Sequence, residues 1–180
     1  IPVSGEGAIG HGFFAFNGTV HSVDRKKAQL LGDYSRSAPL SPTYLNQNVA
    51  AAVAATRKLG VMSEMIIKAL HTYGALPARC EYLGSGEGIS FVDNTRASTR
   101  LAAIKSLQDH SDVYWISGSK LEADLLPSSV RKTYILAPSS PRARKTPLAK
   151  ALTAACRDAG KLRNANPDLN PVIMFAPCLS

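Results

Sequence analysis

The chain has 180 residues, of which 45% are hydrophobic and 19% charged, as in an ordinary soluble globular protein. It is long enough to bury a sizeable core, and no apolar run approaches the length of a membrane span, so we expect no membrane partner. Three widely spaced cysteines, Cys80, Cys156 and Cys178, make neither a disulfide framework nor a zinc pattern, which favours a reducing, cytoplasmic setting.

Much of the net charge of +8 lies between Arg131 and Arg163. Such a basic run can bind nucleic acid or another polyanion, or it can simply be a solvated face. From Arg142 to Lys161 no aromatic side chain interleaves the charges, as a stacking platform for bases would need. This favours the solvated face, and we do not expect nucleic acid as a partner.

The first part of the chain is predicted to hold a hairpin followed by two helices. Apolar residues flank Asn17-Gly18, a pair that favours a tight turn because both residues tolerate positive φ, so residues 13–22 are predicted as the hairpin. Residues 48–59 are predicted as a helix so rich in alanine that it has almost no polar face and should be buried or closely packed. A second helix is predicted from Ser63, as its N-cap, to Gly74.

From Ile89 onward the chain alternates between apolar strands and helices. The predicted strands are 89–92, 113–116, 133–137 and 172–175, and the predicted helices are 99–108, capped by Ser98 or Thr99, and 147–159. This alternation is typical of an α/β fold, with a mainly parallel sheet covered on both faces. Such a Rossmann-like sheet places the carboxyl ends of its strands along one edge, where the polar residues after each strand gather.

One stretch joins the two parts and carries polar residues of chemical interest. Residues 74–81 read Gly-Ala-Leu-Pro-Ala-Arg-Cys-Glu, a glycine-containing turn follows, and the next apolar strand ends in Asp-Asn-Thr-Arg-Ala-Ser at 93–98. This resembles the domain junction of the Mur ligases, which have a Gly-Leu-x-His-Arg-x-Glu turn, a hairpin and a strand ending in Asn-Asp-Ser-Lys-Ala-Thr. The order and spacing match, although several identities differ.

The resemblance is above all to the Mur ligase that adds D-glutamate to UDP-N-acetylmuramoyl-L-alanine in peptidoglycan synthesis. It implies that residues 1–73 end an ATP-binding central domain and that residues 74–180 form the C-terminal, amino-acid-binding domain of a monomeric enzyme. It also implies ATP-dependent amide formation, in which a carboxylate takes the γ-phosphoryl group of ATP and the amino acid's amine attacks the acyl phosphate. Mg²⁺ and protein cations neutralise the phosphate charge in such a transfer.

The resemblance also assigns two sets of site residues. It implies that the amino acid is bound by Arg96, Ser98, Lys120 and Ser180, and the nucleotide by Asn48, Arg79 and Asn94. No catalytic residue or metal ligand is assigned within this chain. Carboxylates bind best to Lys, Arg and hydroxyl donors, and we expect the loops carrying Arg96 and Lys120 to lie side by side after adjacent strands. Each of these residues has a structural alternative as a cap, turn or surface residue.

The chain also departs from the family. No Gly-x-x-x-x-Gly-Lys-Ser/Thr phosphate loop occurs, the lysine that the family carbamylates is missing, and Arg96 stands where the family has Lys, for which it is a poor substitute. We therefore expect part of a larger enzyme, which binds ATP and Mg²⁺ mainly through other segments, and a chain that is inactive alone. Two alternatives stay open: a folylpolyglutamate synthase-like ligase, and a non-catalytic α/β module that binds polyanions through Arg142–Lys145.

Overall fold

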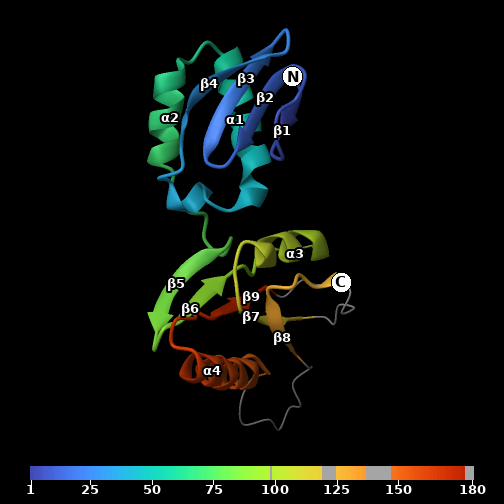
Figure 1. Ribbon diagram of the computed structural model, residues 1–180, viewed down its shortest axis with the longest axis vertical. Helices are drawn as coiled ribbons and strands as arrows, with labels where there is room; N and C mark the ends of the chain where they lie inside the picture. Colours follow the sequence, from blue (N-terminus) through green and yellow to red (C-terminus); the bar gives the residue numbers. More distant parts are fainter. Residues whose placement is uncertain (98, 119–124, 137–146, 177–180) are drawn as a thin grey trace. The chain divides into compact units, whose positions relative to one another are not determined.

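The chain divides into two compact units, Ile1–Ala75 and Leu76–Ser180, and each unit has its own sheet (Figure 1). The computed structural model describes residues 1–97, 99–118, 125–136 and 147–176. Within these ranges, no helix is both long and apolar enough to cross a bilayer. The units are called unit 1 and unit 2 below.

Unit 1 is built on a four-stranded sheet whose strands stand in chain order. The strands are β1 (Val3–Ser4), β2 (Gly12–Phe16), β3 (Thr19–Asp24) and β4 (Lys27–Asp33). β1 runs parallel to β2, and the remaining pairs are antiparallel. The predicted hairpin is confirmed as β2 and β3, which turn at Asn17-Gly18 with positive φ at both residues. β4 was not predicted, because its side chains are mostly exposed and show no alternation.

Two helices and two short 3-10 turns complete unit 1. They are η1 (Ala38–Leu40), η2 (Thr43–Leu45), α1 (Asn46–Lys58) and α2 (Ser63–His71). Both predicted helices are confirmed, but α2 starts with Met62 at the N-cap position, so Ser63 lies inside the helix. Only one face of α1 is buried, through Val49, Ala50, Val53 and Ala54, while Ala51, Ala52 and Ala55 are exposed. α1 was expected to be buried or closely packed, and this holds for one side alone, because only that side of α1 meets the sheet.

Unit 2 is built on a five-stranded sheet with the order β5-β6-β9-β7-β8. The strands are β5 (Glu81–Gly86), β6 (Ile89–Asp93), β7 (Val113–Ser117), β8 (Val130–Ile135) and β9 (Val172–Phe175). The last four strands pair in parallel, which confirms the predicted Rossmann-like sheet, and only β5 is antiparallel. β5 was expected to be part of a glycine-rich turn, whereas the turn is confined to Glu87-Gly88.

Helices α3 (Arg100–Gln108) and α4 (Pro147–Ala165) cover opposite faces of this sheet (Figure 1). α3 begins where predicted, because the Thr99 side chain accepts a hydrogen bond from the Ala102 N–H at 3.2 Å. α4 continues past Gly160, which was predicted to follow its end. A single glycine costs a helix only about 1 kcal/mol, and the buried stripe of Ala151, Ala155 and Ala159 holds α4 against the sheet.

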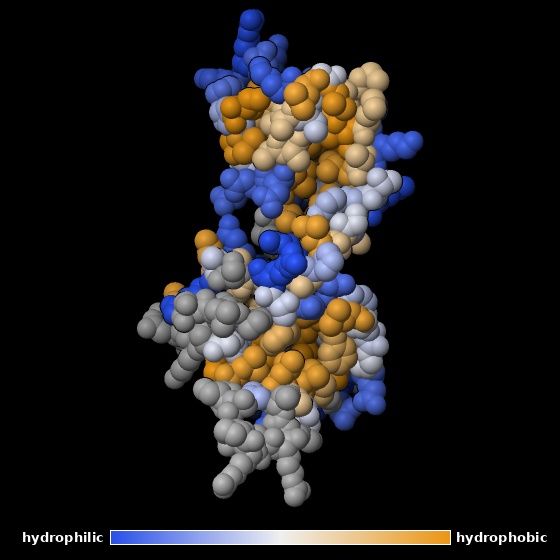
Figure 2. Space-filling model, turned by 180° about the vertical axis from the view of Figure 1, so that it is seen from behind, coloured by the Kyte–Doolittle hydropathy of each residue, from blue (hydrophilic) through white to orange (hydrophobic). Residues whose placement is uncertain are grey.

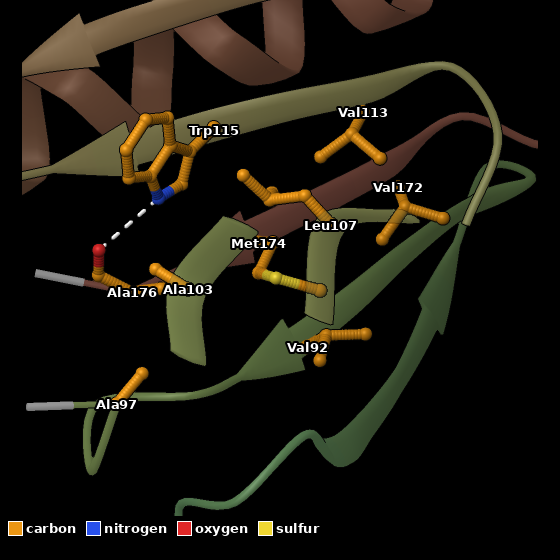
Figure 3. Close-up of a cluster of buried hydrophobic side chains, with 9 residues drawn as sticks. All are labelled: Val92, Ala97, Ala103, Leu107, Val113, Trp115, Val172, Met174 and Ala176. Carbon is orange, nitrogen blue, oxygen red and sulfur yellow. Dashed lines mark hydrogen bonds between the residues drawn. The ribbon is translucent and has the colours of Figure 1, made fainter. Parts of the chain in front are cut away.

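The core between α3 and the sheet surrounds Trp115, which is fully buried (Figure 3). Its indole N–H donates to the carbonyl of Ala176 at 3.1 Å, just after β9. Leu107 of α3 and Met174 of β9 pack in the same cluster. The core therefore fixes the carboxyl ends of β6, β7 and β9, which is where the predicted site lies.

Candidate functional site

The loop that follows β6, residues 93–97, is fixed by hydrogen bonds within unit 2. The Asn94 N–H donates to the carbonyl of Phe175 at 2.8 Å, which places the loop beside the end of β9. The Asp93 carboxylate accepts from the Thr95 N–H at 2.8 Å, and the Ala97 N–H donates to the Asn94 carbonyl at 3.0 Å. These local bonds are typical of an Asx-type turn. They set the loop's shape without any ligand.

The Asn94 side chain joins three segments of unit 2. It is 5% exposed; its amide nitrogen donates to Ser106 Oγ at 2.8 Å, and its oxygen accepts from the Cys80 N–H at 3.3 Å. Ser106 Oγ donates in turn to the Ala103 carbonyl at 2.7 Å. Asn94 thus connects the loop after β6 with α3 and with the turn that precedes β5. In this structure its polar atoms are bonded inside the protein.

That turn, residues 76–81, presents Arg79. Ala78 and Cys80 on either side of it both have positive φ, at 60° and 50°. The Ala78 N–H donates to the Glu81 carboxylate at 2.8 Å, and the Ala78 carbonyl accepts from the Arg96 N–H at 3.0 Å. Positive φ is unfavourable for residues other than glycine and persists only when the surroundings hold it. The hydrogen bonds from Glu81, Asn94 and Arg96 supply that restraint.

Arg79 and Arg96 are therefore carried by two backbone segments that are bonded to each other. Both side chains are exposed, and neither forms an ion pair within the described ranges. Glu81, which could have paired with Arg79, instead bonds the backbone of Ala78. Two unpaired guanidinium groups on a rigid edge suit a ligand that carries phosphate or carboxylate groups, since Arg binds both in a bidentate manner.

The structure places the other predicted site residues as follows. Asn94 is buried at the loop after β6, and Arg79 and Arg96 lie at the same edge of unit 2. Asn48 is exposed on α1 of unit 1. Ser98, Lys120, Ser180 and the basic segment Arg142–Lys145 lie outside the described residues. Sequence reasoning missed the structural bonds of Asn94, because its partners Cys80 and Ser106 are 14 and 12 residues away and no spacing pattern in the sequence indicates such contacts.

One premise of the predicted pocket was wrong. Arg96 and Lys120 were expected to follow adjacent strands, but β9 lies between β6 and β7 and pairs with both. The chain returns to fill the centre of the sheet with its last described strand, an order that the sequence of strands does not reveal. The strands that precede the two residues, β6 and β7, are thus separated by one strand.

The described residues do not offer a metal site. No group of three or more His, Cys, Asp or Glu side chains lies close enough to hold an ion within these ranges. Asp93 and Glu81, the carboxylates at this edge, both bond backbone N–H groups. The edge is suited to binding anions through Arg79 and Arg96, and any Mg²⁺ that accompanies ATP would need ligands from other segments.

Comparison with known proteins gives one consistent result, although no family model matches the chain. The UDP-N-acetylmuramoylalanine--D-glutamate ligase of Phenylobacterium zucineum is 29% identical over 148 residues, which is 78% of this chain and 31% of that protein. The enzyme of the same name from Rhodospirillum rubrum is 27% identical over 192 residues, 98% of this chain and 38% of that protein. The enzyme of the same name from Roseobacter denitrificans is 30% identical over 162 residues, which is 85% of this chain and 35% of that protein.

Among solved structures, MurF from Acinetobacter baumannii matches with a TM-score of 0.51 and 14% identity, over 92% of this chain and 40% of that one. This likeness shows the fold alone. The chain spans about a third of the length of the relatives it matches in sequence. The sequence matches and the shared fold together place the chain in the Mur ligase family, as a relative of its D-glutamate-adding enzymes.

Proposed function

We propose that this chain is part of an ATP-dependent ligase that adds D-glutamate to UDP-N-acetylmuramoyl-L-alanine. Residues 1–73 would end the ATP-binding domain, and residues 74–180 would form the domain that receives the amino acid. The observation that carries the proposal is the pair Arg79 and Arg96, which are exposed, have no ion-pair partner among the described residues, and lie on two segments bonded to each other at the end of β6. The names of the relatives supply the substrates.

The reaction has two steps. The carboxylate of the acceptor attacks the γ-phosphorus of ATP, so that the bond to ADP breaks and an acyl phosphate forms. The amine of D-glutamate then attacks the acyl carbon, an amide bond forms and inorganic phosphate leaves with the electron pair. Cations lower the barrier of the first step by neutralising charge on the phosphate oxygens, a role that Arg79 would fill from the turn before β5.

Arg96 would have a different task in the second step. It lies at the carboxyl edge of the sheet, where α/β folds bind their ligands. Glutamate brings two carboxylates, and Arg96, with Ser98 and Lys120, supplies two cations and a hydroxyl to bind them. The resemblance assigns Asn94 to nucleotide binding. Asn94 would contribute to that binding indirectly, by fixing the turn that carries Arg79.

The amino-acid part of the proposal is tested on the 180-residue chain by NMR titration with D-glutamate. We expect weak, saturable shifts at residues 93–97 that D-alanine, which lacks the second carboxylate, does not produce. Arg96→Ala should abolish them, while Lys105→Ala, which removes an exposed cation from α3, should leave them unchanged. Equal shifts with both amino acids, or none, would contradict the proposal.

The nucleotide part is tested in two settings. The chain alone should show no ATPase activity, because it has no phosphate loop; ATP hydrolysis that disappears in Arg79→Ala would refute this. In an enzyme that includes the missing upstream segments, Lys120→Ala should raise the KM for D-glutamate and leave the KM for ATP nearly unchanged. Equal changes in both constants would remove Lys120 from the amino-acid pocket.

A further inference from the structure

Strand β3 of unit 1 ends in a tight two-residue turn at both of its ends. At one end Asn17 and Gly18 have φ values of 47° and 75°; at the other, Arg25 and Lys26 have 46° and 65°. Positive φ at both central residues is the geometry of a type I′ turn, which Asn-Gly adopts with least strain. Arg-Lys is a poor choice for the same geometry. Left-handed backbone in residues other than glycine is concentrated at functional positions. The unfavourable backbone of Arg25 and Lys26 therefore suggests that their charges have a function.

The tip belongs to a larger basic surface at one end of unit 1. The turn between α1 and α2 lies at the same end (Figure 1), and Asp24, Arg57 and Lys58 line the same open pocket. Lys27, which follows the tip, is also exposed. The surface is named the basic end below, and its cations are Arg25, Lys26, Lys27, Arg57 and Lys58. The turn residues 24–27 and 57–65 contribute two carboxylates, Asp24 and Glu64, so cations outnumber carboxylates by five to two at the basic end.

Apolar side chains stand exposed beside these cations. Leu59, directly after Lys58, is 83% exposed, and Met62 and Met65 are 59% and 58% exposed. Figure 2 shows a hydrophilic projection next to hydrophobic surface at this end of unit 1. Leu59 and Met62 lie in the short connection between α1 and α2, and Met65 lies within α2. None of the three belongs to the core of unit 1, so each could have been polar without cost to it. Their exposure means that water contacts apolar surface close to the cations of the basic end.

We propose that the basic end of unit 1 binds the surface of an anionic lipid bilayer. Clustered Lys and Arg are attracted to anionic headgroups, and exposed Leu and Met side chains enter the interface between headgroups and acyl chains. Nucleic acid fits less well, because no Phe, Tyr or Trp lies among the turn residues 24–27 and 57–65 to stack on bases. A peripheral contact of this kind needs no spanning helix. The proposal goes beyond the expectation of no membrane partner, which rested on the length of apolar runs.

The test is sedimentation of the 180-residue chain with vesicles of phosphatidylcholine, with and without phosphatidylglycerol. We expect binding only to the vesicles with phosphatidylglycerol, weakened by added salt. The central variant is Arg25→Asn with Lys26→Gly, which gives the turn its preferred sequence and so preserves the fold. Losing two cations at about 1 kcal/mol each should weaken vesicle binding on the order of 30-fold.

Two further variants separate this proposal from a general effect of net charge. Lys150→Asn with Lys161→Gln removes the same charge from α4 of unit 2 and should leave vesicle binding nearly unchanged. Leu59→Ser should weaken binding without altering the thermal midpoint, because Leu59 is exposed. The proposal is overturned if the chain binds neither kind of vesicle or both equally, if the unit 2 control weakens binding as much as the turn variant, or if Leu59→Ser binds like the parent chain.

Discussion

The two units cover their sheets differently. In unit 2 a helix packs on each face of the sheet, so every residue of β7 and all but the last residue of β9 are buried. In unit 1 both helices contribute to a single core, and β4 is largely exposed. Burial of apolar surface is the main source of stability. We infer that unit 2 is stabilised by two cores, one on each face of its sheet, whereas unit 1 is stabilised by a single core between its sheet and its helices.

The largest expected effect comes from the core of unit 2. Leu107→Ala should lower the free energy of unfolding by about 2–5 kcal/mol, because Leu107 is fully buried and its removal leaves a cavity beside Trp115. Trp115 is the only tryptophan in the chain, so its fluorescence during urea unfolding reports on unit 2. Leu101→Ala, in the same helix but 65% exposed, is the matched control and should cost well under 1 kcal/mol. Equal losses in the two variants would show that α3 does not pack as described.

A smaller effect is expected at the polar connection of unit 2. Asn94→Ala removes the acceptor for the Cys80 N–H and the donor to Ser106 Oγ. Buried groups that lose a partner cost about 1–3 kcal/mol each, so we expect a loss of about 2–3 kcal/mol. Amide exchange of residues 78–81 should accelerate more than that of β7, since the turn loses its restraint directly. Uniform acceleration across unit 2 would mean that Asn94 supports the core rather than the Arg79 turn.

The comparison also explains how much the sequence could predict. Strands β6, β7 and β9 were predicted to within one residue, because each is a short, mainly apolar run. β4 and β5 were missed because each is largely exposed and contains glycine, so neither shows a period of two. The position of β9 between β6 and β7 was missed because pairing order depends on contacts that are distant in the chain. For the same reason Arg79 and Arg96 could be named from the motif, while the Asn94 bonds that fix them could not.

Unit 1 should be sensitive to crowding between its sheet and α2. A Cβ atom added at Gly32 would overlap the side chain of Ile67, where α2 packs on β4. Gly32→Ala should therefore destabilise unit 1 by about 1–3 kcal/mol, and Ile67→Ala in the same molecule should recover part of that loss. Gly10→Ala, where nothing lies near the added atom, is the control. Circular dichroism should detect the change, and the Trp115 transition should not move; a shift in that transition would show that the units unfold together.

The smallest expected effect is a pH dependence of stability, and it concerns the hydrogen bond of a tyrosine hydroxyl, here called the anchor, in each unit. In unit 1 the Tyr34 hydroxyl donates to the Asn46 side chain at 2.7 Å, and burial raises the pKa of Tyr34 to about 12. In unit 2 the Tyr134 hydroxyl donates at 2.8 Å to Asp158, which also accepts from Lys132 Nζ at 2.6 Å. Burial and the Asp158 bond raise the pKa of Tyr134 above its ordinary value. The first anchor is neutral at both ends, whereas the second depends on an ionised carboxylate.

The Lys132 bond, with that from Tyr134, holds the pKa of Asp158 below the ordinary value of 3.8. A carboxylate whose pKa is lowered by folding stabilises the folded state above its unfolded pKa, and this contribution is lost as the pH falls through the folded pKa. The Trp115 transition of unit 2 should therefore lose stability as the pH drops below about 4. Asp158→Asn should flatten that slope, and the exposed Asp168→Asn should keep it. Because Lys132 is half-exposed, the change should be modest and should shrink in salt. An unchanged slope in Asp158→Asn would show that other carboxylates set the acid sensitivity of unit 2.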